Sequence, residues 1–191
     1  CELSLVLGDV YKRQGISSYN TEQTRLANEI CNENGWSPIV IHQPNYSLFN
    51  RWIEKSLIDT TDKLGIGIIA FCPLYQGLLT DKYLRGTPSS SRAAKTTGLI
   101  REGDLSESVI NCINELNTIA LDRDQTLAQM ALSWVLRDER VTSALIGASS
   151  PEQIVENSNC VKNLKFSVEE EDLINSSLAK ISLPESLWAG E

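Results

Sequence analysis

The chain has 191 residues and a formal net charge of −8, because 25 Asp and Glu outweigh 17 Lys and Arg. A surface for nucleic acid or for an anionic membrane needs a basic face, so this balance disfavours both partners. The hydrophobic (41%) and charged (22%) fractions are those of a folded domain, and the apolar runs are far too short for a bilayer-spanning helix.

The cysteines do not form a recognisable framework. Their number, five, is odd, and no CxxC pair occurs. This spacing is typical neither of a disulfide scaffold nor of a zinc site, so a reducing cytoplasm is the expected compartment.

A helix is predicted over residues 21–34. Asn20 can cap it, and Gln23 stands three residues later, which completes a capping box. Leu26 and Ile30 then fall on one face of the helix.

The next predicted elements are a strand, a helix and a strand. Residues 38–42 are a short β-branched run typical of a buried strand. Residues 51–64 are predicted to form one helix that ends at Gly65, because glycine adopts a positive φ without a steric clash. Residues 66–71 are apolar on both alternating faces, as in a strand covered on both sides of a parallel sheet.

A long loop is predicted over residues 80–104, and loops of this length in compact domains are usually functional or mobile. Helical periodicity resumes over residues 109–119. The clearest amphipathic helix follows a second capping box, formed by Thr126 and Gln129.

A third strand is predicted over residues 141–146, and further helices begin near Ser150 and Ser167. The alternation of helices and strands indicates an α/β fold around a parallel sheet, either doubly wound or a (β/α) barrel. No linker or repeat divides the chain, so one domain is the simplest interpretation.

The junction after the third predicted strand is a candidate anion site. Small residues from Gly147 to Ser150 join a buried strand to a helix start, where unpaired amides and the helix dipole favour negative charge. Phosphate groups often bind beside the last strands of (β/α) barrels. The alternative is that Ser150 only caps the helix and Gly147 only turns the chain.

A second candidate lies at the carboxyl end of the middle strand, in residues 71–77. Ligands of parallel α/β folds gather at such ends, and Phe71 could either stack on a flat ring or belong to the core. Lys82 and Arg92 in the following loop could either meet phosphates or be solvated only.

Other motifs give negative results. Gly65 and Gly67 precede a strand and lack a third glycine, so they do not form a Rossmann fingerprint. His42 is the only histidine, without a carboxylate and a nucleophile at recognisable spacing, so a structural role is favoured over a catalytic one. The sequence predicts no metal site.

Four consecutive segments resemble motifs of the aldo-keto reductase superfamily: GISSY (15–19), HQPNYSLFNR (42–51), FCPLYQGLLTDKY (71–83) and LIGASSPEQIVEN (145–157). Within it they are similar to the L-glyceraldehyde 3-phosphate reductases and the potassium-channel β subunits. The resemblance implies that residues 15–191 form part of a (β/α)8 TIM barrel, from about the end of strand five through the C-terminal helices.

The resemblance also implies an NADP(H) site spread over these motifs. The implied contacts are Ser17, Ser18 and Gln43 with the nicotinamide carboxamide, Phe71 with its ring, Cys72, Leu74, Gln76 and Gly77 with the pyrophosphate, Lys82 and Arg92 with phosphate or adenosine, and Gly147, Ser149, Gln153, Glu156 and Asn157 with the adenosine 2′-phosphate and adenine.

Some of these positions depart from the family pattern. Many relatives have Asn in place of Ser18, Tyr or Trp in place of Phe71, and Ser in place of Cys72. An aromatic face is kept at Phe71, whereas the side-chain hydrogen bond expected of a serine is weakened at Cys72. Gln153 stands where some relatives have Arg, so a preference for NADP over NAD stays open.

No catalytic residue is predicted in this chain. The family's catalytic Asp, Tyr, Lys and His belong to the N-terminal half of the barrel, which the resemblance does not cover, and His42 is not that histidine. Residues 1–14 do not resemble the family, so we expect an artefactual or disordered leader. A partial barrel would expose two sheet edges and an apolar face, which predicts marginal stability, aggregation or assembly with another fragment.

The resemblance implies a cytoplasmic NADP-dependent oxidoreductase that reduces an aldehyde or ketone, such as one like glyceraldehyde 3-phosphate, by hydride transfer. This chain would be its cofactor-binding portion, inactive alone. The partner would be a small-molecule carbonyl substrate, and the full-length protein could form homo-oligomers. One alternative is a redox-sensing regulatory subunit resembling the potassium-channel β subunits, and another is a scaffold without a ligand.

Overall fold

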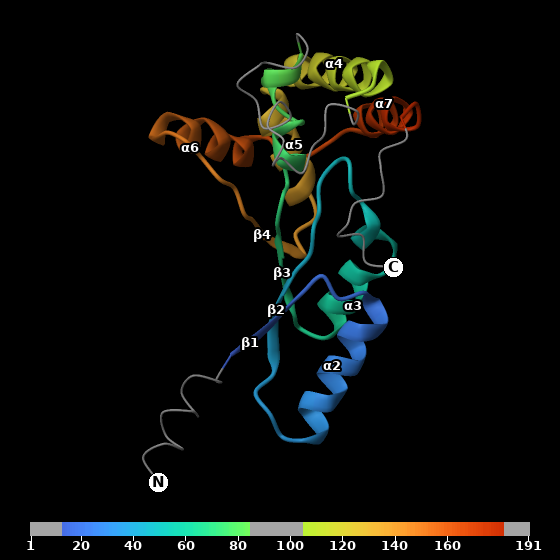
Figure 1. The fold of residues 1–191 in the computed structure, drawn as a ribbon, viewed down its shortest axis with the longest axis vertical. Coiled ribbons are helices and arrows are strands. Elements are labelled where there is room, and N and C mark those ends of the chain that lie inside the picture. The colour runs from blue at the N-terminus through green and yellow to red at the C-terminus, as the bar shows by residue number, and fades with distance from the viewer. Residues whose placement is uncertain (1–12, 85–104, 182–191) are drawn as a thin grey trace.

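A computed structural model describes residues 13–84 and 105–181, which form a parallel sheet flanked by helices (Figure 1). Its four strands lie in the order in which they occur along the chain. They are β1 (Gln14–Ser17), β2 (Ile39–Gln43), β3 (Gly67–Ala70) and β4 (Val141–Ala144). The predicted α/β class with a parallel sheet is therefore confirmed.

Helices connect the strands and cover one side of the sheet. Figure 1 shows α2 and α3 beside the lower part of the strands, and α4, α5 and α7 grouped at the upper end. The α-helices are α2 (Thr21–Glu33), α3 (Leu57–Lys63), α4 (Glu107–Asp122), α5 (Leu127–Leu136), α6 (Pro151–Ser158) and α7 (Val168–Leu178). The described residues also contain short 3-10 helices: η1 (Trp52–Lys55), η2 (Tyr75–Gly77), η3 (Asp81–Tyr83) and η5 (Asn159–Lys162).

The predicted helix starts are confirmed, because each capping side chain finds an orphan amide of the first turn. Both predicted capping boxes form, at the starts of α2 and α5, and a third forms at the start of α7. At α6, the Ser150 side chain accepts from the Gln153 amide, and Pro151 takes the first helical position.

Several elements differ from the prediction. The single helix expected over residues 51–64 is broken at Ser56, whose extended φ of −161° interrupts the helical path between η1 and α3. Strand β1 was not predicted, because its four residues alternate with polar groups and form no apolar run. The predicted loop contains η3, and its residues 85–104 lie outside the described part of the chain, as do residues 1–12 of the predicted leader.

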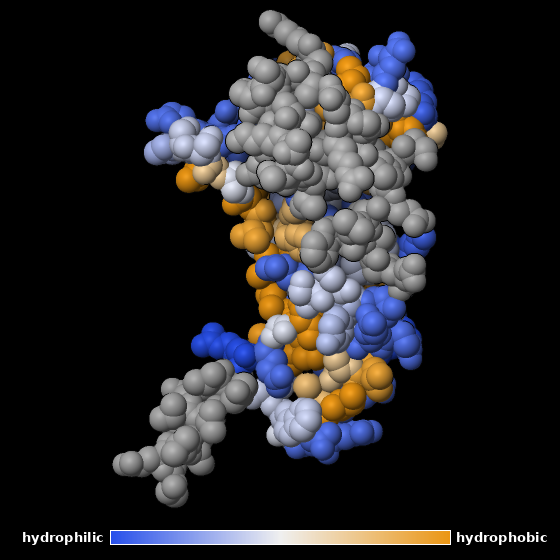
Figure 2. Space-filling view, viewed as in Figure 1, coloured by the Kyte–Doolittle hydropathy of each residue, from blue (hydrophilic) through white to orange (hydrophobic). Residues whose placement is uncertain are grey.

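The sheet has one buried face and one open face. In β3, Ile68 and Ala70 are fully buried, whereas Gly67 and Ile69 are partly exposed. The prediction that this strand is covered on both sides is therefore wrong. Leu145, just after β4, is 53% exposed, and Figure 2 shows hydrophobic surface along the strands.

Glycines leave room for side chains of the neighbouring strands on the open face. A Cβ added to Gly15 would lie 2.6 Å from Cγ2 of Ile41, and one added to Gly67 would lie 2.9 Å from Oγ1 of Thr142. Ile41 pairs with both glycines, because it is opposite Gly15 in β1 and Gly67 in β3. These positions therefore require glycine for packing.

The buried face rests on hydrophobic clusters. One joins β3 and β4 to α3 and α5 through residues such as Leu57, Ile68 and Val135. The largest lies between α4, α5 and α7, with Trp134 at 0% exposure. In α2, by contrast, the apolar pair Leu26 and Ile30 stays exposed.

Candidate functional site

The predicted site residues gather where the strands end. In a parallel sheet all carboxyl ends lie on the same side, which is where ligands of α/β folds bind. The Leu145 amide donates to the Ala70 carbonyl oxygen at 2.8 Å, which brings the segment after β4 beside the end of β3. The loops that follow β1, β2, β3 and β4 are thus neighbours.

Ser17, Ser18 and Gln43, the residues predicted to contact the nicotinamide carboxamide, lie next to one another. The Ser17 hydroxyl and the Ser18 amide both donate to the Gln43 carbonyl oxygen, at 2.9 Å and 3.2 Å. Ser18 has a backbone φ of 57°, an unusual value for a residue other than glycine. The arrangement fixes the turn after β1 against the end of β2, with the Ser17 side chain exposed.

His42 has the structural role that its isolation in the sequence favoured. Its side chain is fully buried, and Nε2 donates to the Tyr19 carbonyl oxygen at 3.0 Å. Burial lowers the pKa of His42 from 6.5 to about 4, against the opposing effect of that hydrogen bond. The imidazole is therefore neutral at pH 7, and it holds the turn that carries Ser17 and Ser18.

Acidification is expected to destabilise the fold through His42. Its folded pKa lies below the unfolded value, so the unfolded state binds the proton more tightly. The stabilisation is complete above pH 6.5 and is lost as the pH falls toward 4. We expect a loss of roughly 2–3 kcal/mol between pH 7.5 and 4.5, measured by urea unfolding. His42→Asn keeps a donor without titrating, and an equal pH dependence in this variant would contradict the assignment.

Phe71 lies at the end of β3 and forms a parallel bridge with Asn45. Its amide donates to the Pro44 carbonyl oxygen at 3.0 Å, and its carbonyl oxygen accepts from the Tyr46 amide at 3.2 Å. The side chain is half-buried, so Phe71 is not a full member of the core. Sequence reasoning missed Asn45 and Tyr46, since only the pairing of β2 with β3 brings them to Phe71.

The loop after Phe71 winds through left-handed backbone. Cys72, Tyr75 and Gln76 have φ values of 55°, 44° and 58°, and Gly77 has 96°. Gln76 Nε2 donates to Cys72 Sγ at 3.2 Å, and the Gly77 amide donates to the Leu74 carbonyl oxygen at 2.9 Å. Residues held in this region cluster at ligand-binding sites. The predicted pyrophosphate residues thus form one compact turn.

The β4–α6 junction brings Ser149 and Gln153 together. The Ser149 amide and hydroxyl donate to Gln153 Oε1 at 2.8 Å and 3.2 Å. Ser150 caps the helix, as the plainer interpretation of this segment predicted. A hydrogen bond from its own amide, together with the Ser150 hydroxyl, lowers the pKa of the exposed Glu152 carboxylate. A phosphate at this junction would have to replace the Gln153 oxygen at Ser149.

The remaining predicted residues are less closely gathered. Glu156 is exposed on α6, and its carbonyl oxygen accepts from Gln129 Nε2 at 2.8 Å. Asn157 is buried, with an Nδ2 that has no hydrogen-bond partner among the described residues. Lys82 is exposed in η3, and Arg92 lies outside the described residues.

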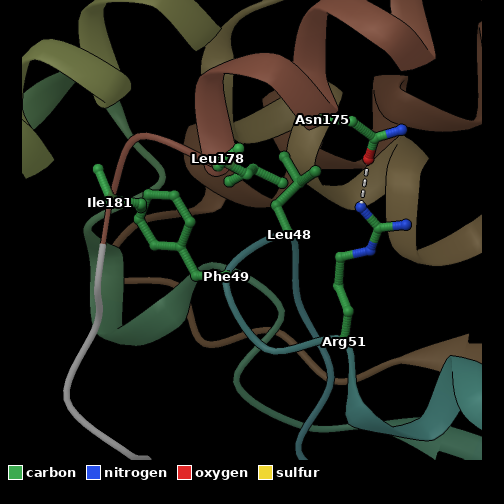
Figure 3. A pocket seen from close by; sticks show the side chains of 7 residues that line it. Leu48, Phe49, Arg51, Asn175, Leu178 and Ile181 are labelled. Atoms are coloured by element: carbon green, nitrogen blue, oxygen red, sulfur yellow. Dashed lines mark hydrogen bonds between the residues drawn. The ribbon is translucent and has the colours of Figure 1, made fainter.

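A pocket of about 390 Å³ lies apart from these loops, between α7 and the segment after β2 (Figure 3). Arg51 Nη1 donates to Asn175 Oδ1 at 2.6 Å across it. Its lining residues are Leu48, Phe49, Arg51, Asn175, Leu178, Ala179 and Ile181. None of them is a predicted site residue, and the mainly apolar lining offers one cation that Glu54 and Asn175 already bind.

Within residues 13–84 and 105–181, no group of three or more His, Cys, Asp or Glu side chains is arranged to hold a metal ion. The helices of the same residues include none with the length and hydropathy of a membrane span.

The sequence profile of the Aldo/keto reductase family matches residues 8–179, a span that contains every strand and helix described above. The chain belongs to the aldo/keto reductase family. The resemblance read from the four motifs is thereby confirmed. The match to this family begins within the stretch expected to be a leader.

Two kinds of relative in the aldo/keto reductase family are similar to the chain. L-glyceraldehyde 3-phosphate reductases of Escherichia coli K12 and O157:H7 are each 48% identical over 179 residues, which is 91% of this chain and 51% of theirs. A probable voltage-gated potassium channel subunit beta of Oryza sativa subsp. japonica is 31% identical over 146 residues, 75% of this chain and 44% of that protein. The chain spans about half the length of the curated relatives it matches.

Proposed function

We propose that this chain is the NADP(H)-binding portion of an aldo-keto reductase whose whole protein reduces aldehydes or ketones to alcohols. The supporting observation is that Ser17, Gln43, Phe71 and Ser149 gather at the carboxyl ends of neighbouring parallel strands. Similarity to the L-glyceraldehyde 3-phosphate reductases favours a substrate like glyceraldehyde 3-phosphate.

The proposal includes a partial (β/α)8 barrel. A doubly wound sheet reverses its strand order at a switch point, whereas β1 to β4 follow one another without reversal. The small residues Gly15 and Gly67 and the partly exposed Ile69 line the open face. That face is the inner side of the proposed barrel, which further strands would enclose.

The residues present fit a nicotinamide dinucleotide phosphate. Ser17 and Gln43 offer hydroxyl and amide groups for a carboxamide, and Phe71 offers a half-buried aromatic ring. The left-handed turn over residues 72–77 allows main-chain amides to approach a diphosphate, and Ser149 at the start of α6 lies where an anion is favoured. NADPH, when bound, supplies the hydride for carbonyl reduction.

We also propose that the chain binds cofactor without reducing a carbonyl by itself. No motif in it matches the acid and base residues that the family resemblance implies, and its one histidine is buried and neutral. The alternative, a regulatory subunit like the potassium-channel β subunits, has weaker support, because the sequence identity to those subunits is 31–32%, against 48% to the reductases. A cytoplasmic location is also proposed, and the four described cysteines, which form no disulfide, agree with it. We further propose that the whole protein forms homo-oligomers.

Removal of the Phe71 ring is expected to weaken NADPH binding. In Phe71→Ala the dissociation constant should rise roughly tenfold, because aromatic stacking on a flat ring contributes about 1–1.5 kcal/mol. Quenching of tryptophan fluorescence during a titration measures it. Leu173→Ala, at an exposed position on α7, serves as the control and should bind as wild type does. Equal affinity in all three proteins would exclude Phe71 from the site, and a folded wild type without binding would refute the proposed function.

A further inference from the structure

A buried polar cluster is attached to the segment that pairs with Phe71. The Tyr46 hydroxyl donates to Glu54 Oε1 at 2.7 Å and accepts from Arg137 Nη1 at 2.7 Å. Arg137 Nη2 also donates to Glu54 Oε1, at 3.1 Å. The three residues come from the segment after β2, from η1 and from the end of α5, and Tyr46 is 0% exposed.

This cluster is rigidly held. The Arg137 guanidinium lies 3.7 Å from the ring centroid of Trp134, which is fully buried. Burial raises the pKa of Tyr46 well above its usual range, so the hydroxyl keeps its proton and remains a donor. Burial acts to raise the pKa of Glu54, but hydrogen bonds from Arg51 and Tyr46 and the charge of Arg137 hold it below its usual value. An ionised acceptor makes these bonds strong.

The same tyrosine holds the main chain of Phe71. The Tyr46 amide donates to the Phe71 carbonyl oxygen at 3.2 Å, and the Phe71 amide donates to the Pro44 carbonyl oxygen at 3.0 Å. Between them, the Asn45 carbonyl oxygen accepts from Trp52 Nε1 at 2.8 Å. Phe71 is therefore attached on both sides to a segment whose position the Tyr46 side chain fixes.

We propose that Tyr46, bound by Glu54 and Arg137, is a positioning residue that sets the orientation of the Phe71 ring toward the nicotinamide. This inference rests on the proposed function, because it assumes that Phe71 faces the cofactor. Tyr46 would act through its main-chain bond to Phe71 and not through a contact of its own with the cofactor. Its effect is confined to the nicotinamide half of the site, since the β4–α6 junction carries the other half.

The variant Tyr46→Phe separates positioning from folding. It keeps the buried ring and removes only the hydroxyl, while Glu54 and Arg137 still pair with each other. We expect the dissociation constant for NADPH to rise about three- to tenfold, as for the loss of one hydrogen bond. The constant for adenosine 2′,5′-bisphosphate, which lacks the nicotinamide, should not change. Tyr83→Phe, another buried tyrosine, is the matched control and should bind both compounds as wild type does.

Amide hydrogen exchange without any ligand gives a second, independent readout. In Tyr46→Phe, the amides of Phe71 and Tyr46 should exchange about tenfold faster, whereas those of Ile113 in α4 should not change. Unchanged exchange at Phe71 would overturn the inference whether or not NADPH binds. Equal weakening of NADPH and the bisphosphate would also overturn it. Absence of NADPH binding to folded wild type would refute the proposed function instead.

Discussion

Replacement of Trp134 by alanine is expected to lower the free energy of unfolding by about 3–5 kcal/mol. Trp134 is the largest fully buried side chain of α5 and belongs to the main core cluster. Phe166 packs edge-on at 5.3 Å between ring centroids, and the guanidinium groups of Arg137 and Arg51 lie 3.7 Å and 4.7 Å from the ring. Removal of the Trp134 ring leaves a large cavity and takes a cation–π partner from both Arg51 and Arg137.

Urea unfolding followed by circular dichroism measures this effect. Trp134→Phe keeps part of the packing and should show an intermediate loss. Val168→Ala, at a side chain that is 73% exposed, should change stability by less than about 0.5 kcal/mol. A Trp134→Ala variant as stable as Val168→Ala would contradict the packing described for α4, α5 and α7.

Truncation of Arg123 is the second change with a large expected effect. Its side chain is 2% exposed and pairs with Glu170 Oε2 at 2.5 Å. It also donates to Gln125 Oε1 and to the carbonyl oxygens of Asn163 and Lys165, at 3.0 to 3.1 Å. Arg123→Ala takes a donor from each of these acceptors and the positive charge from Glu170, so we expect a loss of about 3–5 kcal/mol.

Two further variants make this prediction specific. Arg123→Lys keeps the charge but not the planar set of donors, so its stability should fall between those of wild type and Arg123→Ala. Arg140 also bonds carboxylates, Asp59 and Asp138, yet its side chain is 39% exposed. Arg140→Ala should therefore cost less than about 1 kcal/mol. Equal losses from Arg123→Ala and Arg140→Ala would show that burial does not determine the strength of these pairs.

Local sequence signals predicted most helices, because capping depends on neighbours in the chain. Asn20 with Gln23 and Thr126 with Gln129 mark helix starts that the structure reproduces. The break at Ser56 was missed because its hydroxyl bonds to Thr21 Oγ1 at 2.7 Å, a contact 35 residues away. Strand β1 was missed for a related reason, since its stability comes from pairing with β2 and not from its own composition.

In the candidate site, too, local motifs could be recognised in the sequence, whereas contacts between distant segments could not. The motifs predicted residues that would share one cofactor, and in the structure Ser17 contacts Gln43 and Cys72 contacts Gln76. The Tyr46 cluster could not be found from the sequence, because its partner Arg137 lies 91 residues further along the chain. Supporting residues of this kind become visible only when the fold brings distant segments together.

The most direct test of the proposed cofactor site is the effect of NADPH on the amide resonances of the isotope-labelled chain. We expect shifts concentrated in three segments at the carboxyl ends of the strands, around Ser17, around residues 71–77 and around Ser149. Resonances of Leu48 and Leu178, which line the pocket beside α7, should stay unchanged. A folded chain whose spectrum does not respond, or responds only around that pocket, would contradict the proposed cofactor site.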